Sequence, residues 1–212
     1  GEGAVQDRQA AQKAEPADIT TKQIFSSIPF LMMLVFSFLF AVCMSPSSHL
    51  QNIALSSGFT SAAGAMMVSA YMTGEFVGKL GLGWLNDRWG INRAVLLVTS
   101  VGMVGIVGLC FVGSFGPQFG LLCALFFGPM TATTSVGYTL IANNTFGAKL
   151  YPRYYPYMSM ASTMAFSVGS PMLGYMYDFT GKWNPALIMV LCGLILSLVL
   201  LTVSTKIMTK ER

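Results

Sequence analysis

Six apolar segments of membrane-spanning length follow one another along this chain, and no other feature constrains its fold as strongly. A helix needs about 20 predominantly apolar residues to cross the hydrocarbon core of a bilayer. Only 9% of the 212 residues are charged, whereas about a quarter are charged in an ordinary soluble domain. We therefore predict an all-α integral membrane protein whose spanning helices cover residues 24–45, 62–85, 94–112, 118–142, 156–177 and 185–204.

The basic residues between the segments determine the expected orientation. With the N-terminus in the cytoplasm, nearly all of them fall on the cytoplasmic side, and Lys182 falls on the other. Positively charged loops stay in the cytoplasm during insertion, so we expect both termini there, in a plasma (inner) membrane. The same rule accounts for the net charge of +4 without a nucleic-acid partner. It also places the Asn143-Asn144-Thr145 glycosylation motif in the cytoplasm.

The chain divides into three parts by polarity. Residues 1–23 are polar and should form a partly disordered cytoplasmic linker. Residues 24–206 should form the six-helix bundle, and residues 207–212 a short cytoplasmic tail. The sequence starts with Gly1 and has no signal-peptide pattern, so we expect it to begin inside a longer protein.

Glu75 and Lys79 are the two charges that lie inside a predicted span. Charges at bilayer depth cost about 2.5–3.5 kcal/mol each to insert, so those that persist usually face protein or a water-filled cavity. Their i, i+4 spacing puts both on one helical face in the favourable acid-before-base order. We interpret them as candidate ligands for substrate or proton. A second interpretation stays open, in which Lys79 snorkels to the cytoplasmic surface and Glu75 only neutralises it.

Two spans carry hydroxyl groups along one face. In the fourth span, Gly128-Pro129 precedes four polar residues, Thr131, Thr134, Ser135 and Tyr138; in the fifth, a stripe joins Ser159, Ser162, Thr163, Ser167 and Ser170. A proline in a membrane helix frees a backbone acceptor that a neighbour or cavity water must satisfy. The pattern favours a water-filled path with Tyr138, Ser167 and Ser170 as substrate contacts. Hydroxyls that bond only their own backbone explain it equally well.

Other functional classes find little support. The four cysteines, Cys43, Cys110, Cys123 and Cys192, form no paired motif that would indicate a disulfide framework or a zinc site. His49 is the sole histidine and has no acid near it in the sequence, so we expect neither catalysis nor a metal or cofactor. Asn184-Pro185-Ala186 is the tripeptide of aquaporins, but that fold needs two copies. We interpret it as a helix cap followed by a first-turn proline.

The loop after the second span resembles the signature of a known family. Gly83-Trp84-Leu85-Asn86-Asp87-Arg88-Trp89-Gly90-Ile91-Asn92-Arg93 is similar to the G-x-L-x-D-R-x-G-R-R motif of the major facilitator superfamily. Ile91 and Asn92 depart from the motif, as is typical of its second copy in that family. Gly169-Ser170-Pro171 and the run from Gly174 to Gly181 also resemble the family's eleventh helix.

The resemblance implies that the chain forms helices seven to twelve, the C-terminal bundle of a twelve-helix fold with 3+3 inverted repeats. Its partners would be the lipid bilayer and the N-terminal six-helix half of the same transporter. A conformational latch whose ion pairs bias one of two states would comprise Gly83, Asp87, Arg88, Gly90 and Arg93. The alternative is a loop that only anchors the membrane edge.

A finer resemblance concerns the charged pair. Glu75-x-x-x-Lys79-x-x-x-Gly83 is similar to the acid-x-x-x-Arg-x-x-x-Gly pattern on helix eight of monocarboxylate transporters, and oxalate/formate antiporters also place a base there. This implies that Lys79 holds the substrate anion and that Glu75 is its proton-linked partner. Lysine departs from the family's arginine because a point charge cannot make a bidentate contact.

We therefore expect a secondary active transporter and not an enzyme. It would move a small organic anion, such as a carboxylate, by proton-coupled symport or exchange through alternating access. Two alternatives remain. One is a major facilitator importer or exporter of another small solute, such as a sugar or a drug; the other is a membrane subunit or sensor that transports nothing.

Overall fold

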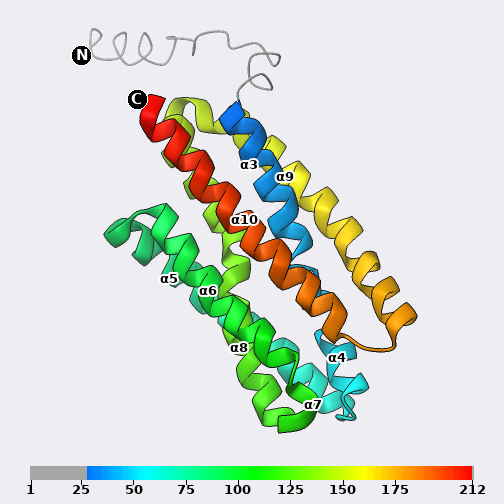
Figure 1. The fold of residues 1–212 in the computed structure, drawn as a ribbon. Helices are drawn as coiled ribbons and strands as arrows, with labels where there is room; N and C mark the ends of the chain where they lie inside the picture. The colour runs from blue at the N-terminus through cyan, green and yellow to red at the C-terminus, as the bar shows by residue number, and fades with distance from the viewer. Residues whose placement is uncertain (1–27, 212) are drawn as a thin grey trace, which may run out of the picture.

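Helices make up all the regular structure in the computed structural model, which describes residues 28–211 except for the side chains at 29, 146, 148–149 and 205–211 (Figure 1). In chain order they are α3 (Ile28–Val42), η1 (Ser45–His49), α4 (Leu50–Ser56), α5 (Ser61–Trp89), α6 (Ile91–Leu109), α7 (Val112–Phe115), α8 (Pro117–Ala132), η2 (Thr133–Gly137), α9 (Tyr138–Thr180) and α10 (Asn184–Glu211). The predicted linker, residues 1–23, lies outside the described residues, as does the last residue of the predicted tail.

Four stretches of the described chain are long and apolar enough to cross a membrane: Phe30–Ser56, Ile91–Leu109, Pro117–Thr145 and Asn184–Ser204. They coincide with the first, third, fourth and sixth predicted spans, so the prediction of an all-α membrane protein is confirmed. The second and fifth predicted spans also form long helices, α5 and the later part of α9. Both contain charged or hydroxyl residues that lower their hydropathy.

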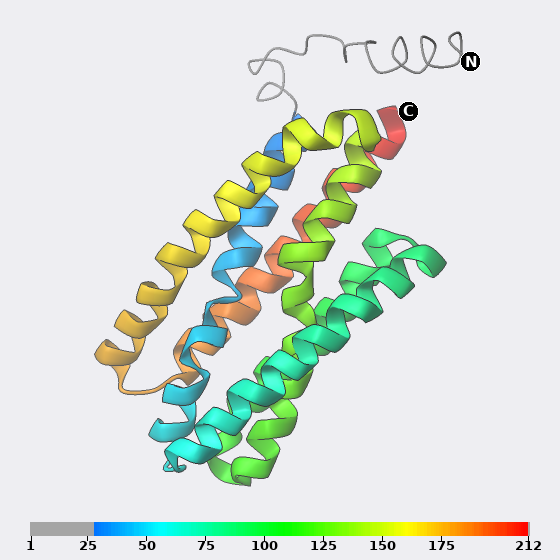
Figure 2. The same cartoon turned by 180° about the vertical axis from the view of Figure 1, so that it is seen from behind.

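The long helices run alternately up and down the bundle. α3 begins and α10 ends at one end, which we call the terminal end (Figure 1). α4, α7 and the loop 181–183 lie at the opposite end, which we call the α4 end, as the view from behind also shows (Figure 2). α5, α6 and α8 pack together as one group, and α3 packs with α9 and α10 as a second.

α5 and α8 approach each other so closely that only glycine fits where they cross. A Cβ atom at Gly74 would collide with the carbonyl of Leu125, one at Gly78 with the backbone of Pro129, and one at Gly128 with the backbone of α5. Pro129 has no N–H, so the Leu125 carbonyl lacks its donor four residues later. Small residues permit this kind of approach between helices in lipid.

The helix does not continue regularly beyond Pro129. Residues 133–137 form one π-helical turn, η2, before α9 begins at Tyr138. π-turns are rare and occur mostly as single turns inside α-helices, frequently at functional sites. Tyr138 directly follows this turn and is fully buried against α3, with its ring near Phe36 and Phe40.

The first span does not end at residue 45, as the sequence had predicted. The chain turns after Val42, continues as η1 and then as α4, and the apolar stretch extends to Ser56. Pro46 is tolerated because it occupies the first turn of η1, where its missing N–H has no helical partner to lose. The first span is therefore a broken helix rather than a short one.

The connection between the fourth and fifth predicted spans, which includes residues 146–155, is also shorter than expected. Helix α9 extends through this region, and its one non-helical residue is Gly147, with φ of 76° and ψ of 163°. Glycine adopts a positive φ without the steric cost that other residues incur. A single glycine therefore kinks the chain where the composition had suggested ten residues of loop.

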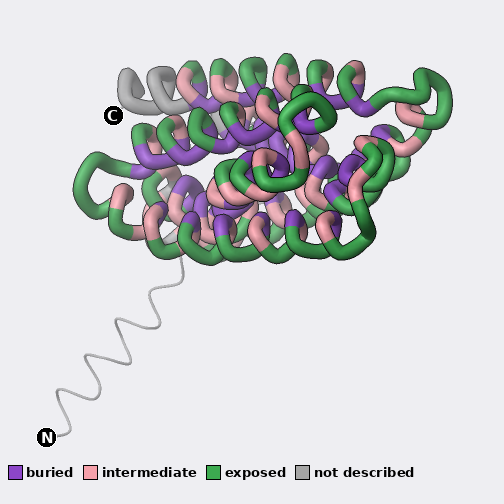
Figure 3. The backbone as a smooth tube through the Cα atoms, turned by 90° about the horizontal axis from the view of Figure 1, so that it is seen from below, coloured by how far each residue is buried: buried purple, intermediate pink, exposed green. Residues whose placement is uncertain are grey.

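Buried residues lie between the helices, and the turns that face outward are exposed (Figure 3). Many outward side chains are large and apolar, including Val104 on α6 and Ile195 and Val199 on α10. Such residues would cost free energy in water, but they match the hydrocarbon of a bilayer. Gly102, Gly105 and Gly108 instead face α8 and let the two helices pack closely.

We expect Gly74→Ala to destabilise the protein and Gly81→Ala to leave it intact. The new methyl group at position 74 would overlap the Leu125 carbonyl, whereas no atom lies within 4 Å of a Cβ at Gly81. Overpacking typically costs about 1–3 kcal/mol, and alanine in an open helical position gains up to about 1 kcal/mol. Thermal unfolding of the detergent-solubilised parent protein measures both. Equal melting temperatures for the two variants would contradict the close crossing.

Candidate functional site

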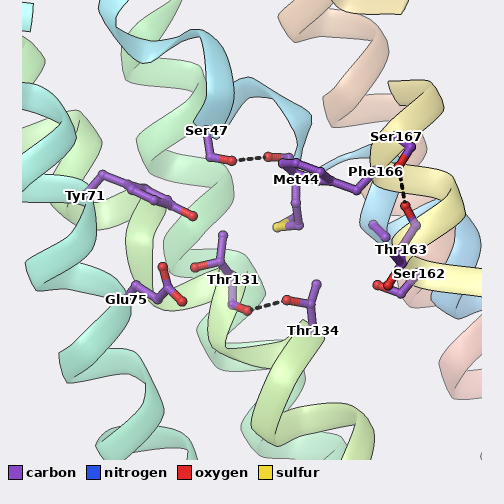
Figure 4. Close-up of a pocket in the computed structure, with 11 residues that line it drawn as sticks. Met44, Ser47, Tyr71, Glu75, Thr131, Thr134, Ser162, Thr163, Phe166 and Ser167 are labelled. Atoms are coloured by element: carbon purple, nitrogen blue, oxygen red, sulfur yellow. Dashed lines mark hydrogen bonds between the residues drawn. The ribbon is translucent and has the colours of Figure 1, made fainter. Parts of the chain in front are cut away.

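A cavity of about 340 Å³ lies between the two groups of helices (Figure 4). It is bordered by the break between α3 and η1, by the middle of α5, by α8 with η2, and by α9. Its lining residues are Ala41, Met44, Ser47, Tyr71, Glu75, Thr131, Thr134, Ser162, Thr163, Phe166 and Ser167. Most of the side chains in this wall are polar, which is unusual inside a bundle of apolar helices.

Glu75 is the one charged residue in the cavity wall, and it pairs with Lys79. The Lys79 Nζ lies 2.8 Å from the Glu75 Oε1, with Lys79 41% exposed and Glu75 27% exposed. Lys79 itself does not line the cavity, so its ammonium group reaches the site through Glu75. The neighbouring Gly74 holds this part of α5 against α8.

Tyr71 also lines the cavity, although it was not among the residues predicted from the sequence. It precedes Glu75 by four residues and Lys79 by eight, so the three share one face of α5. Its ring packs against Phe127 of α8 with the ring centroids 5.3 Å apart. Its side chain points into the space near Thr131 (Figure 4). Extending the i, i+4 spacing of the charged pair by one step toward the N-terminus would have found it.

Most of the hydroxyl groups in the wall donate their hydrogen to a backbone carbonyl. The pairs are Ser47 Oγ to Met44 at 2.8 Å, Thr131 Oγ1 to Gly128 at 2.6 Å, Thr134 Oγ1 to Thr131 at 2.8 Å, Thr163 Oγ1 to Ser159 at 3.0 Å and Ser167 Oγ to Thr163 at 2.9 Å. A carbonyl oxygen can only accept, so in each pair the hydroxyl must donate. What these groups present to the cavity is therefore mainly acceptor lone pairs.

The three hydroxyl residues that the sequence suggested as substrate contacts lie in different places. Ser167 lines the cavity. The Tyr138 hydroxyl is buried and donates to the Ser37 carbonyl at 2.9 Å, where it joins α9 to α3. Ser170 lies outside the cavity wall, next to His49, whose Nε2 is 2.9 Å from the Ser170 carbonyl. The structure thus brings Ser167 together with Glu75 but not the other two.

The predicted latch residues lie at the junction of α5 and α6. Gly90 ends α5 and begins α6 with φ of 80°, and its N–H donates to the Asn86 carbonyl at 2.9 Å. Only glycine adopts this conformation readily, which explains that position of the motif. Gly83 faces open space.

The charged latch residues do not pair with one another. Asp87 accepts a hydrogen bond from Asn86 Nδ2 at 3.3 Å, and the Arg88 guanidinium lies 5.3 Å from the centre of the Trp84 ring. Asp87 makes no ion pair with Arg88 or Arg93 within the described part of the chain. Consecutive residues on a helix face different directions, which separates Asp87 from Arg88. The latch stays a prediction that requires a partner outside this bundle.

Comparisons with known proteins bear on the fold. The family model described as Major Facilitator Superfamily matches residues 2–170. Among solved structures, the crystal structure of the E. coli fucose:proton symporter, FucP, is similar with a TM-score of 0.70 and 14% sequence identity. The match covers 90% of this chain and 47% of that one, so this chain spans about half the length of the symporter. No curated protein matches the sequence.

We expect the Glu75–Lys79 pair to reveal itself in the stability of three variants. Lys79→Gln leaves the Glu75 carboxylate unpaired in the cavity wall, which typically costs about 1–3 kcal/mol. Glu75→Gln should cost less, because Lys79 is exposed enough to reach water. The double variant should recover most of the loss, since no charge remains to be buried. Thermal unfolding in detergent measures the series, and strictly additive effects would contradict a direct pairing.

Proposed function

Since this chain belongs to the major facilitator superfamily, a family of membrane transporters and not of enzymes, we propose that it is the C-terminal half of a secondary transporter for a small organic anion. The anion would be a carboxylate, moved by proton-coupled symport or exchange. The partner that completes the site would be an N-terminal six-helix half. Coverage of 47% of a solved fucose:proton symporter supports the proposal of a half.

The packing pattern supports a bundle of six spans with 3+3 inverted repeats. The first long helix, α3, packs with the fifth and sixth, whereas the fourth, α8, packs with the second and third. In two interleaved three-helix repeats, the first helix of each repeat would pack with the last two helices of the other repeat. The contacts of α3 and α8 follow this arrangement. Residues 24–206 would form this bundle, with the linker 1–23 and the tail 207–212 both in the cytoplasm.

The acid–base pair at the cavity wall is the observation that carries the proposal. While Glu75 is ionised, Lys79 is neutralised by the carboxylate 2.8 Å away. Protonation of Glu75 would leave the Lys79 charge without its carboxylate partner, and an entering anion would supply one. Release of the proton would restore the pair and displace the anion. Proton and anion would therefore bind together, which is the coupling that symport requires.

Alternating access would follow from rocking of the two halves about this cavity, as in secondary transporters of related design. Asp87, Arg88 and Arg93 lie where α5 ends and α6 begins, and we place them in a latch toward the missing half. Because they form no ion pair with one another, they are available to a partner surface. This would bias one conformation over the other.

A second candidate substrate has a specific observation in its favour. The hydroxyl groups of Ser47, Thr131, Thr134, Thr163 and Ser167 present acceptors, because their hydrogens point to backbone carbonyls. Glu75 adds a further acceptor. Such a wall suits a solute rich in hydrogen-bond donors, such as a neutral sugar. It suits a carboxylate substrate less well, because a carboxylate offers only acceptors. We retain this alternative as the one that the uptake experiment must separate from the first.

Uptake into proteoliposomes distinguishes a carboxylate substrate from a neutral sugar. The complete parent protein is assayed with labelled monocarboxylates, dicarboxylates and neutral sugars, with and without an inward proton gradient. We expect carboxylate uptake to be driven by the gradient and to fall by about 10- to 100-fold in Lys79→Gln, since a hydrogen bond to a charge is worth about 1.5–3 kcal/mol. The matched control is Lys182→Gln, which removes a lysine outside the cavity.

Two results would contradict the anion proposal. Equal pH dependence of uptake in wild type and in Glu75→Gln would remove Glu75 from the coupling. Sugar uptake without carboxylate uptake would move the substrate to the second candidate. In that case we expect Glu75→Gln to impair uptake and Lys79→Gln to have the smaller effect.

Cysteine labelling tests the proposed orientation of the chain in the membrane. We expect a cysteine at Lys182 to react with a membrane-impermeant maleimide on intact cells, and a cysteine at Trp89 to react only after permeabilisation. Both variants are made in a background in which the four native cysteines are alanine. Trp89 and Lys182 are exposed. Trp89 is the last residue of α5, and Lys182 lies in the loop between α9 and α10, at the α4 end. Labelling of Trp89→Cys on intact cells would overturn the proposed cytoplasmic termini.

A further inference from the structure

A second chamber, of about 310 Å³, lies at the α4 end of the bundle. Its wall is made by His49, Asn52, Leu55, Ser56, Gly174, Tyr177, Asp178 and Trp183. Asp178 is far from His49 in the chain, so no acid lies near this histidine in the sequence. The structure puts both on the wall of one chamber.

His49 fastens the broken first span to α9. Its Nε2 lies 2.9 Å from the Ser170 carbonyl and 3.3 Å from the Ser170 Oγ. A carbonyl accepts only, so Nε2 carries the hydrogen. The imidazole also packs against the Trp183 ring at 5.1 Å, and Trp183 stacks on Tyr177 at 4.4 Å. Nδ1 remains as the atom that can take up a second proton.

This contact lies between the cavity and the chamber. Thr163 and Ser167 line the cavity, Ser170 contacts His49, and Gly174 and Asp178 line the chamber. Their spacing of four, three, four and four residues puts all five on one face of α9. A solute or water moving along that face between the two spaces would meet the His49–Ser170 contact.

The same junction is tightly closed and leaves polar atoms without partners. A Cβ at Gly169 would collide with Ser45 Oγ and Val42, so η1 and α9 touch there. The Ser45 hydroxyl is fully buried and has no hydrogen-bond partner, and the same is true of the indole N–H of Trp183, which is 7% exposed. Buried polar groups of this kind cost about 1–3 kcal/mol. Water entering an opened junction would satisfy both.

We propose that His49 is a second proton-binding site of this transporter and that its protonation releases η1 and α4 from α9. The inference rests on the proposed transport function and concerns access to the same cavity. In the neutral state, His49 holds the junction closed through Ser170. A proton at Nδ1 makes the ring a cation, for which the Asp178 carboxylate across the chamber is a stronger acceptor than a neutral carbonyl. The ring then turns toward Asp178, and the cavity opens toward the α4 end.

The charged groups around His49 are consistent with a turn of the protonated ring toward Asp178. On α9 the titratable groups of the chamber are Asp178 and Tyr177; α4 contributes Asn52 and Ser56, which do not titrate. Lys182 lies in the adjoining loop and lines a neighbouring cavity but not the chamber. Asp178 is thus the one anionic group that faces His49 among the described residues. Histidine is also the side chain that ordinarily changes charge between about pH 5 and pH 8.

Cysteine accessibility tests the proposal without requiring transport. A reporter cysteine replaces Ala41 in the cavity wall of the cysteine-free parent protein. Its rate of reaction with an impermeant thiol reagent, added from the side of Lys182, is compared at about pH 5.5 and pH 7.5. Each rate is divided by that of Lys182→Cys, which corrects for the reagent's own pH dependence. We expect the ratio to rise roughly fivefold or more at the lower pH.

Two variants separate proton binding from a merely structural role. His49→Gln keeps a donor that can reach Ser170 but cannot titrate, so the ratio should stay low at both pH values. Asp178→Asn should abolish the rise because it removes the ionic partner. An unchanged ratio in the wild type, or a rise that persists in His49→Gln, would overturn the proposal. Because Lys79→Gln should retain the rise, the anion hypothesis can fail in the uptake assay while this inference stands.

Discussion

Gly74, Gly78 and Gly128 let the backbones of α5 and α8 touch, and the position of the charged pair depends on that contact. Glu75 of α5 and Thr131 of α8 line the same cavity because the two helices lie this close. The crossing also covers the Leu125 carbonyl, which Pro129 deprives of its usual donor. Close packing and local backbone irregularity therefore occur together, and the polar cavity forms where they meet.

The chemical character of the cavity follows from helix geometry as much as from residue type. Serine and threonine in a helix can return their hydrogen to a carbonyl three or four residues earlier, as they do along α8 and α9. The wall then offers acceptors, and the single cation nearby is held by Glu75. Recognition of an anion would thus depend on the protonation state of one carboxylate. A donor-rich neutral solute would not need that change.

Hydropathy alone predicted the helical membrane fold and the approximate place of each long helix, because the bilayer demands length and apolarity. It also singled out Glu75, since a charge at that depth is costly. The i, i+4 spacing that relates Glu75 to Lys79 would also have identified Tyr71. Tyr138 shows the limit: its hydroxyl satisfies the Ser37 carbonyl, a partner about a hundred residues away. The meeting of His49 with Asp178 depends equally on tertiary packing, which no local pattern in one sequence contains.

The π-turn at residues 133–137 has an evolutionary consequence. A π-turn holds one residue more than an α-helical turn, as a single-codon insertion would leave behind. Each residue of an α-helix advances the side chain by about 100°, so removing one residue here would rotate everything that follows relative to Thr131. Tyr138 would leave its place against α3, and the hydroxyls of α9 would face another neighbour. The number of residues in this one turn therefore determines which surface of the downstream helix can be selected for solute recognition.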